Sequence, residues 1–246
     1  MKTTRNGLSR RAFSRGLALA AGGLALGLKN ELLLAQTGRP IRIGIIGAGN
    51  IGGAIGKLWS QAGHEVLFAS RNPDELKGLV AEAGPKARAG LPKDAAEFGP
   101  VVFLAVPYGA IPQIGQDFGS ILKGKVVIDC SNPSPRRDGA MAEEARQKGS
   151  GVATAEYIPG ARVTRAFGTI NFKVALDNAH RAGDKIAIPI AGDDAEAVKV
   201  TSDLVIDAGF EPVMVGGLAR SKEFDFGAPG SGKNTTAAEL RKILNL

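Results

Sequence analysis

The stretch "IRIGIIGAGNIGGAIGKLWSQAG" at residues 41–63 places an apolar run, a glycine turn and a helical pattern in direct succession. The apolar run indicates a strand buried on both faces, as in parallel sheets. Small and apolar residues then recur at helical spacing and end at a glycine. A sheet buried on both faces needs helices to cover it. This one stretch therefore restricts the chain to an α/β fold.

The same alternation continues along the chain, and the 34 glycines among 246 residues suit its many tight turns. Strands connected by helices imply right-handed crossovers and a doubly wound, mostly parallel sheet. We expect a Rossmann-like domain over residues 40–222, followed by a small αβ C-terminal extension whose loop and helix occupy residues 223–246. Further strands are expected near residues 64–70, 86–90, 101–106, 125–130, 161–168, 185–192 and 210–216. Helices are expected near residues 50–63, 73–84, 92–98, 108–122, 170–180 and 194–208.

The net charge of +7 raises nucleic-acid binding as a candidate function, but its distribution argues against it. Residues 1–36 carry six basic side chains and one acidic side chain, which leaves 25 basic and 23 acidic side chains for the rest of the chain. The basic excess is therefore concentrated in the N-terminal segment. We expect no nucleic-acid partner.

That segment, residues 1–36, contains "SRRAF" followed by an apolar stretch from Gly16 to Leu28. The stretch is too short to span a bilayer of about 30 Å as a helix. The segment resembles a twin-arginine export signal, which predicts passage through the twin-arginine translocon to the periplasm or another extracytoplasmic compartment. Ala35 is a candidate last residue of the removed signal, although Leu33 fits the cleavage pattern poorly. An uncleaved chain would be tethered to the membrane.

The residues Gly47, Ala48, Gly49, Asn50, Ile51 and Gly52 match the pattern G-x-G-x-x-G between a strand and a helix, which is the context that the pattern requires. Gly47 permits the tight turn, Gly49 lets a pyrophosphate approach the backbone, and Gly52 allows close packing of helix on strand. Free N–H groups and the helix dipole favour an anion there. These six residues are candidate contacts for a dinucleotide; a glycine-rich turn without a ligand is the alternative.

The stretch "FASRNPDEL" ends the second strand without the acidic residue that binds the ribose of NAD. Arg71 lies 19 residues after the last fingerprint glycine, where the adenine ribose of a dinucleotide rests. Its guanidinium can pair with a 2′-phosphate, and Ser70 and Asn72 can add hydrogen bonds. Lys77, one helical turn on, is a further candidate. The pattern predicts NADP, although turn, capping and solvated surface roles also account for these residue types.

Other reactive side chains are few. Cys130, the one cysteine, follows the apolar strand "KVVID" and is expected to be a small buried thiol, so no intrachain disulfide can form. His64 and His180 are expected in surface turns. The sequence contains no cluster of His and Cys residues that would indicate a metal site. Tyr108 and Tyr157 lack a lysine four residues later, which disfavours a Tyr-Lys proton-relay dehydrogenase. No catalytic residue can be named from the sequence.

Six motifs in order, over about residues 41–220, resemble the coenzyme F420-dependent NADP reductase family: "IGIIGAGNIGGAIG", "ASRNP", "VVFLAVPYGAIP", "KVVIDCSNP", "PGARVTRAFGTI" and "AGDDAEA". The resemblance implies an NADPH-dependent oxidoreductase that transfers a hydride between the nicotinamide and a deazaflavin ring. The same dinucleotide-binding design occurs in the cytosolic part of membrane ferric reductases and in pyrroline-5-carboxylate reductase. The large helical C-terminal domain of the latter does not fit in the remaining chain.

The resemblance also implies roles for two loops at the carboxyl edge of the sheet, where ligands of such folds bind. Ala105, Val106 and Pro107 would lie along the nicotinamide half of NADP. Asn132 and Pro133, after the next strand, would lie near its ring. Val-Pro and Asn-Pro also mark ordinary loops, so turn chemistry is the alternative for both.

Hydride transfer depends on the stacking of two rings and needs neither a metal nor a nucleophile, in keeping with the residues present. NADP(H) is therefore the expected cofactor, and F420 or a flavin is the expected small-molecule redox acceptor. A non-catalytic NADP-binding protein of the cell envelope and a ferric or quinone reductase with bound flavin are the alternatives. A homodimer is a candidate assembly.

The C-terminal stretch "GAPGSGKN" at residues 227–234 nearly matches the triphosphate-binding pattern G-x-x-x-x-G-K-[ST]. Asn234 replaces the hydroxyl residue that would hold magnesium, and no clear buried strand leads directly into the stretch. Thr236 and Glu239 instead fit a capping box for a final helix. We expect no nucleoside-triphosphate site here.

Overall fold

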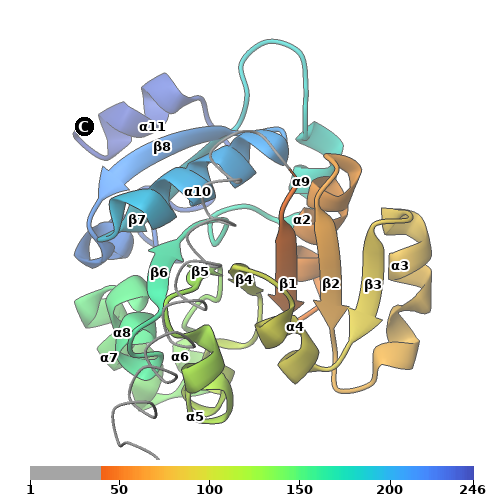
Figure 1. Cartoon of the computed structure of the whole chain (residues 1–246). Coiled ribbons are helices and arrows are strands. Elements are labelled where there is room, and N and C mark those ends of the chain that lie inside the picture. Colours follow the sequence, from red (N-terminus) through yellow and green to blue (C-terminus); the bar gives the residue numbers. More distant parts are fainter. Residues whose placement is uncertain (1–39) are drawn as a thin grey trace, which may run out of the picture.

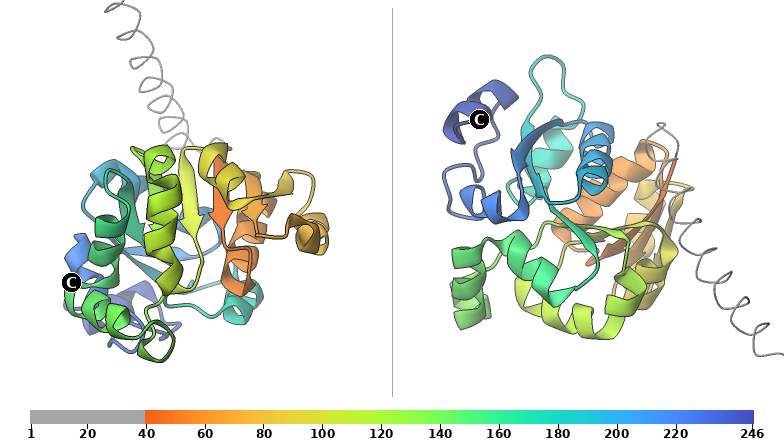
Figure 2. Two further views of the ribbon diagram at one scale, coloured as in Figure 1. Left: turned by 90° about the horizontal axis from the view of Figure 1, so that it is seen from below. Right: turned by 60° about the vertical axis from the view of Figure 1, so that its left-hand side comes forward.

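A computed structural model describes residues 40–246 as one twisted sheet of eight strands with helices on both faces (Figures 1 and 2). The strand order is β3-β2-β1-β4-β5-β6-β7-β8, and every neighbouring pair is parallel except β6 and β7. The doubly wound α/β fold is thereby confirmed. The strands are β1 (Arg42–Ile46), β2 (Glu65–Ala69), β3 (Ala87–Gly90), β4 (Val101–Leu104), β5 (Val126–Asp129), β6 (Arg162–Arg165), β7 (Ala187–Gly192) and β8 (Glu211–Gly216).

Two apolar cores lie on the two faces of the sheet. One face is covered by α2 (Asn50–Gln61), α3 (Lys77–Ala83), α9 (Phe172–Asn178) and α10 (Ala195–Asp207). The other is covered by α4 (Pro92–Phe98), α5 (Ile111–Leu122), α7 (Ala140–Lys148) and α8 (Ser150–Tyr157). The remaining elements are η1 (Pro73–Leu76), η2 (Tyr108–Ala110), α6 (Pro135–Asp138), η3 (Leu218–Glu223) and α11 (Ala237–Ile243).

The central strands are apolar throughout because both of their faces are buried. Successive side chains of a strand point to opposite faces, so Ile43 and Ile45 of β1 enter the core under α2, whereas Ile46 enters the core under α4. Residues of β4 alternate in the same way, with Phe103 on one side and Leu104 on the other. This arrangement is the reason that the sequence shows continuous apolar runs rather than alternation.

Helix α2 is anchored through Trp59, which is fully buried. The indole packs edge to face on Phe103 and Phe167, with ring centroids 5.1 and 5.7 Å away. Its Nε1–H donates a hydrogen bond of 2.7 Å to the carbonyl of Leu204 in α10. The helix that follows the glycine turn is therefore fixed in position against both β4 and α10.

The segment between residues 134 and 160, for which the sequence predicts no element, contains α6, α7 and α8. Gly139, with a φ of 59°, separates α6 from α7, and Gly149, with a φ of 96°, separates α7 from α8. Such positive φ angles suit glycine and interrupt a helix. The buried residues of α7 are Ala142 and Ala145, and those of α8 are Ser150, Gly151, Ala153 and Thr154, so no large apolar residues recur at helical spacing to mark these helices in the sequence.

The C-terminal part extends the same sheet with β7 and β8, and Figure 1 shows α11 lying over these two strands. Phe224, Leu240 and Leu244 pack there against inward-facing residues of both strands. The predicted capping box is confirmed, because Thr236 accepts from the Glu239 N–H at 3.3 Å while the Glu239 carboxylate accepts from the Thr236 N–H at 3.2 Å. The triphosphate-like stretch leads into this cap.

The expectation of a surface turn is confirmed for His180 and wrong for His64, which is only 6% exposed. The His64 Nδ1 accepts a hydrogen bond from the Ile41 N–H at 3.3 Å, and Nε2 lies 3.0 Å from a carboxylate oxygen of Asp207. The ring thus connects the start of β1 to the end of α10. Because Asp207 follows His64 by 143 residues, no local pattern reveals the contact.

This burial predicts a pH dependence of stability. Desolvation lowers the pKa of His64 below its ordinary value of 6.5, although Asp207 acts in the opposite direction. Nδ1 must be unprotonated to accept the hydrogen bond from the Ile41 N–H. The folded chain therefore binds the proton that would give His64 a positive charge less readily than the unfolded chain does. The contribution of His64 to stability is then present above pH 6.5 and is lost as the pH falls below it.

The measurement is urea unfolding at about pH 7.5 and about pH 5, for the wild type and for His64→Gln. We expect the wild type to lose more free energy of unfolding on acidification than the variant does. An equal loss in both proteins would contradict this role of His64.

The predicted export signal at residues 1–36 lies outside the described residues. Between residues 40 and 246, the structure contains no helix with the length and apolar character needed to cross a membrane. Cys130 is buried as expected, and burial raises the pKa of its thiol well above the ordinary value.

Candidate functional site

The glycine turn joins β1 to α2 at the carboxyl edge of the sheet. The chain runs from β1 outward to β2 and β3 on one side, and then returns to place β4 and β5 on the other side of β1. Open parallel sheets bind their ligands in the crevice at such a reversal of strand order. The candidate residues after β1, β2, β4 and β5 all lie along this edge.

The three fingerprint glycines differ in what surrounds them. Gly47 has a φ of +100°, and a Cβ there would lie 2.4 Å from the carbonyl oxygen of Ala105. A Cβ on Gly52 would lie 2.0 Å from the carbonyl oxygen of Gly47. By contrast, a Cβ on Gly49 would meet no atom of the described residues, 40–246, within 4 Å. Packing requires two of the glycines, whereas Gly49 leaves open space over the turn.

This open space faces the amino end of α2. Gly49 occupies the N-cap position and, as a glycine, offers no side chain to cap the helix, whose first turn contains no acidic residue. The first N–H groups of a helix have no intrahelical acceptor, and the helix dipole favours negative charge there. Asn50 is exposed beside them, while Ala48 and Ile51 are half-buried against the core. The arrangement fits a pyrophosphate, which would lie against the backbone at Gly49.

The residues after β2 lie next to this turn, because the Ala48 N–H donates to the carbonyl of Ala69 at 3.2 Å. The Ser70 hydroxyl accepts from the Asn72 N–H at 3.1 Å, and the Asn72 amide donates to Glu75 at 2.8 Å. Both side chains therefore shape the turn. Arg71 is exposed and has no hydrogen bond or ion pair to any other residue between 40 and 246. Its guanidinium is available to an anionic ligand.

Lys77, the fourth candidate on this side, is engaged elsewhere. Its ammonium forms an ion pair of 2.8 Å with Asp74, and both side chains are 80% exposed. Exposed pairs of this kind contribute little to stability, so the pair is easily exchanged. The structure thus groups Ser70, Arg71 and Asn72 at the end of β2 and leaves Lys77 one turn away.

The loop after β4 packs directly on the glycine turn. The Ala105 N–H donates to the carbonyl of Ile46 at 2.9 Å, and the carbonyl of Ala105 lies close to Gly47. Val106 is half-buried, whereas Pro107 is exposed. The two loops that follow β1 and β4 therefore form one continuous surface.

The loop after β5 holds Asn132 in a fixed orientation. The Asn132 amide nitrogen donates to the carbonyl of Gly168 at 2.7 Å, and its amide oxygen accepts from Arg165 at 2.6 Å. Pro133 is buried next to it. The Ser131 N–H donates to Asp129 at 2.7 Å, which fixes the start of the loop.

One functional side chain, Asp138, was not identified from the sequence. Its carboxylate is 3% exposed and accepts from the Gly109 N–H at 3.2 Å and from the Ser134 N–H at 2.9 Å. Arg137 lies against the same carboxylate, holds the pKa of Asp138 below its ordinary value, and donates to the carbonyl of Asn132 at 2.7 Å. Asp138 thus connects the loop after β4 to the loop after β5.

A sequence signal for Asp138 does exist. It follows Ser134 and a proline at the first helical position, and its carboxylate reaches back to the backbone of Ser134 at the N-cap, as the acidic residue of a capping box does. The usual spacing in that motif is three residues, and here it is four. The pattern is therefore easily missed.

Comparisons with known proteins find relatives of this chain. Residues 42–133 match the protein family described as NADP oxidoreductase, coenzyme F420-dependent. Over 191 residues the chain is 28% identical to metalloreductase STEAP3 of Rattus norvegicus, a match that covers 75% of this chain. The match covers only 36% of that longer protein.

Solved structures extend the likeness to the whole fold. A hypothetical protein from Sinorhizobium meliloti superposes with a TM-score of 0.70 at 30% identity, over 80% of this chain and 95% of that one. A protein assigned as an F420-dependent NADP reductase from Arthrobacter sp. FB24 superposes with a TM-score of 0.65 at 21% identity, over 74% of this chain and 87% of that one. The second match supports the fold. The chain therefore belongs to one family with the Sinorhizobium meliloti protein, and its residues 42–133 match a family of NADP oxidoreductases.

Proposed function

We propose that the chain oxidises NADPH and passes the hydride to a flavin-like ring, with the deazaflavin coenzyme F420 as the preferred acceptor. The observation that carries the proposal is the exposed Arg71 at the end of β2, which has no hydrogen bond or ion pair within residues 40–246 and lies beside a glycine turn at the N-cap of α2. This pair of features suits a dinucleotide with a 2′-phosphate. The description of the matching family supports F420 as the acceptor.

In this proposal, the two ends of the site bind different parts of NADPH. The backbone at Gly49 and the start of α2 hold the pyrophosphate, and Arg71 pairs with the 2′-phosphate. The loops at residues 105–107 and 131–133 flank the nicotinamide and shield it from water. When bound, NADPH supplies the hydride, so the task of the chain is to hold two rings face to face.

The buried tyrosine of the loop after β4 is not suited to proton transfer. The Tyr108 hydroxyl donates to the carbonyl of Ser150 at 3.0 Å, and its side chain is fully buried. Burial raises the pKa of Tyr108 far above its ordinary value of 10.0. Its contacts assign Tyr108 to packing of the loop, which is consistent with a reaction that depends on ring stacking.

The test is an acceptor screen with the purified protein. NADPH oxidation is followed with F420, FMN, FAD and ferric chelates, and each assay is repeated with NADH. We expect turnover with NADPH and F420 that is faster than turnover with any other pair. Binding of NADPH without turnover on any acceptor would instead indicate a non-catalytic NADP-binding protein.

A second candidate function is reduction of metal ions through a bound flavin. It is favoured by the likeness to metalloreductase STEAP3, although this chain spans about a third of that protein. A flavin absorption spectrum in the isolated protein, together with ferric reduction that depends on that flavin, would support this candidate over the deazaflavin reductase.

We also propose that residues 1–36 direct export through the twin-arginine translocon, on the basis of Arg10 and Arg11 before the apolar stretch. The test replaces both arginines with lysine in the full chain. Export of the variant at the wild-type level would contradict the proposal.

A further inference from the structure

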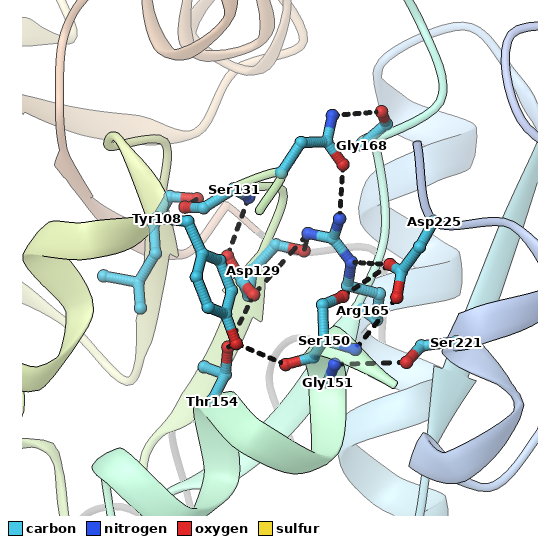
Figure 3. A network of polar contacts seen from close by, with 12 residues as sticks. Tyr108, Asp129, Ser131, Ser150, Gly151, Thr154, Arg165, Gly168, Ser221 and Asp225 are labelled. Carbon is cyan, nitrogen blue, oxygen red and sulfur yellow. Dashed lines mark hydrogen bonds and ion pairs between the residues drawn. The ribbon is translucent and has the colours of Figure 1, made fainter. Parts of the chain in front are cut away.

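Three charged side chains meet in the interior between β5, β6 and the C-terminal segment at residues 218–246 (Figure 3). Asp129, Arg165 and Asp225 are 0%, 1% and 4% exposed. The guanidinium of Arg165 lies 3.5 Å from the Asp129 carboxylate and 3.2 Å from the Asp225 carboxylate. The function proposed above does not use this cluster.

The cluster reaches the candidate site through Asn132. Arg165 donates from Nη2 to the Asn132 amide oxygen at 2.6 Å, which leaves the amide nitrogen to bond the carbonyl of Gly168 at 2.7 Å. A Cβ at Gly168 would lie 2.7 Å from the same Nη2, so the backbone of Gly168 packs closely against the guanidinium. The position of Arg165 therefore sets the orientation of the carboxamide.

Two partners hold Arg165 in turn. Its Nη1 donates to the carbonyl of Asp129 at 3.1 Å, and its Nε donates at 3.2 Å to Asp225, which comes from the C-terminal segment. The Asp225 carboxylate accepts from the Ser150 N–H at 2.9 Å and from the Ser150 hydroxyl at 2.5 Å, at the start of α8. Nearby, the Ser221 hydroxyl accepts from the Gly151 N–H at 3.1 Å. The segment is thus fastened to α8 at the point where it presents its carboxylate to Arg165.

Stability alone does not account for such a cluster. Removing charges from water is costly, and apolar residues of similar volume often stabilise a core equally well. A polar cluster does, however, fix the directions of its members because each donor has a defined acceptor. Here the chain of contacts from Asp225 ends on the loop after β5, at the nicotinamide side of the candidate site.

We propose that Asp225 is a positioning residue for the nicotinamide end of the cofactor site, acting through Arg165 on the carboxamide of Asn132. The proposal rests on the NADP site described above. It makes the C-terminal segment at residues 218–246 part of the binding machinery. Cofactor binding and docking of the segment are then coupled.

The experiment compares two ligands, NADPH and adenosine 2′,5′-bisphosphate, which lacks the nicotinamide half. Asp225→Asn keeps the size of the side chain and removes its charge. We expect the Kd for NADPH to rise about fivefold or more, as is usual for coupled sites, and the Kd for the bisphosphate to stay unchanged. Glu223→Gln is the matched control, because Glu223 pairs with Arg220 in the same segment at 2.7 Å without contact to Arg165.

A double variant separates positioning from general weakening of the fold. With Asn132→Ala already in place, Asp225→Asn should change the affinity for NADPH no further. Independent effects of the two substitutions, an equal loss of affinity for both ligands, or an unchanged affinity for NADPH in Asp225→Asn would each overturn the proposal. If Asp225→Asn does not fold, Asp225→Glu replaces it, because this variant keeps the charge but displaces the carboxylate. The same result is then expected, namely a raised Kd for NADPH and an unchanged Kd for the bisphosphate.

Failure of the proposed function would give a different result. A wild-type chain that does not bind the bisphosphate would have no NADP site of the kind described, and both proposals would fall together. Binding of the bisphosphate to the wild type and to Asp225→Asn alike, with equal NADPH affinities in the two proteins, would overturn only the role of Asp225.

Discussion

Replacing Arg71 with glutamate is expected to raise the Kd for NADPH about 30-fold or more, because a charge-assisted pair worth about 2 kcal/mol is lost. The new carboxylate would repel a 2′-phosphate but accept hydrogen bonds from a ribose 2′-hydroxyl. The affinity for NADH should therefore be unchanged or improved. Isothermal titration of both nucleotides measures the exchange of preference directly.

Arg88→Glu provides the matched charge reversal. Arg88 lies on the neighbouring strand β3 and pairs at 2.9 Å with Glu65, which begins β2 at the end opposite Arg71. We expect this variant to bind NADPH as the wild type does at moderate ionic strength. If both reversals weaken NADPH binding equally, the effect is one of overall charge and Arg71 is not the phosphate ligand.

Alanine at Gly49 should leave the stability of the fold almost unchanged, whereas alanine at Gly52 should lower it. Among the residues that the structure describes, no atom lies within 4 Å of a methyl group at Gly49, and the φ of −76° suits any residue. The free energy of unfolding should therefore change by less than about 0.5 kcal/mol. The same methyl group fills the space over the turn. The Kd for NADPH should rise about tenfold or more, the equivalent of about 1.4 kcal/mol.

Gly52→Ala should instead damage the fold. Its Cβ would lie 2.0 Å from the carbonyl oxygen of Gly47, so β1 and α2 must separate, at a cost of about 1–3 kcal/mol. Gly78→Ala is the control for glycine replacement in a helix, because the new Cβ has open space in α3. Since alanine favours a helix more than glycine does, this substitution should stabilise the chain by about 1 kcal/mol. Thermal unfolding of the three variants checks the order, and destabilisation by Gly49→Ala as large as that by Gly52→Ala would contradict the assignment of open space.

The parts of the fold that the sequence predicts are those governed by short-range patterns. The run before Gly47 predicts a buried strand because a two-sided core requires apolar residues at every position. The helices α7 and α8 could not be predicted, since the residues that they bury are all small and give no apolar periodicity. Local pattern succeeds where large apolar residues repeat at the period of the element.

The site divides in the same way. The glycine turn and Arg71 are recognisable because spacing along one βαβ unit places them. Asp225 and Arg165 are 60 residues apart, and each is a charged residue of a type usually found at the surface. Their burial depends on the C-terminal segment folding back onto α8, which no local signal contains. His64 and Asp207 form a second contact of this long-range kind.

The chain has one tryptophan, and the packing of Trp59 makes it a built-in optical reporter. The indole sits on the helix that begins at the glycine turn, between two phenylalanine rings and a carbonyl acceptor of α10. Its emission therefore shifts when α2 separates from the sheet. Because reduced nicotinamide absorbs in the range where indole emits, the same residue can follow folding and NADPH binding in a single sample without an added label.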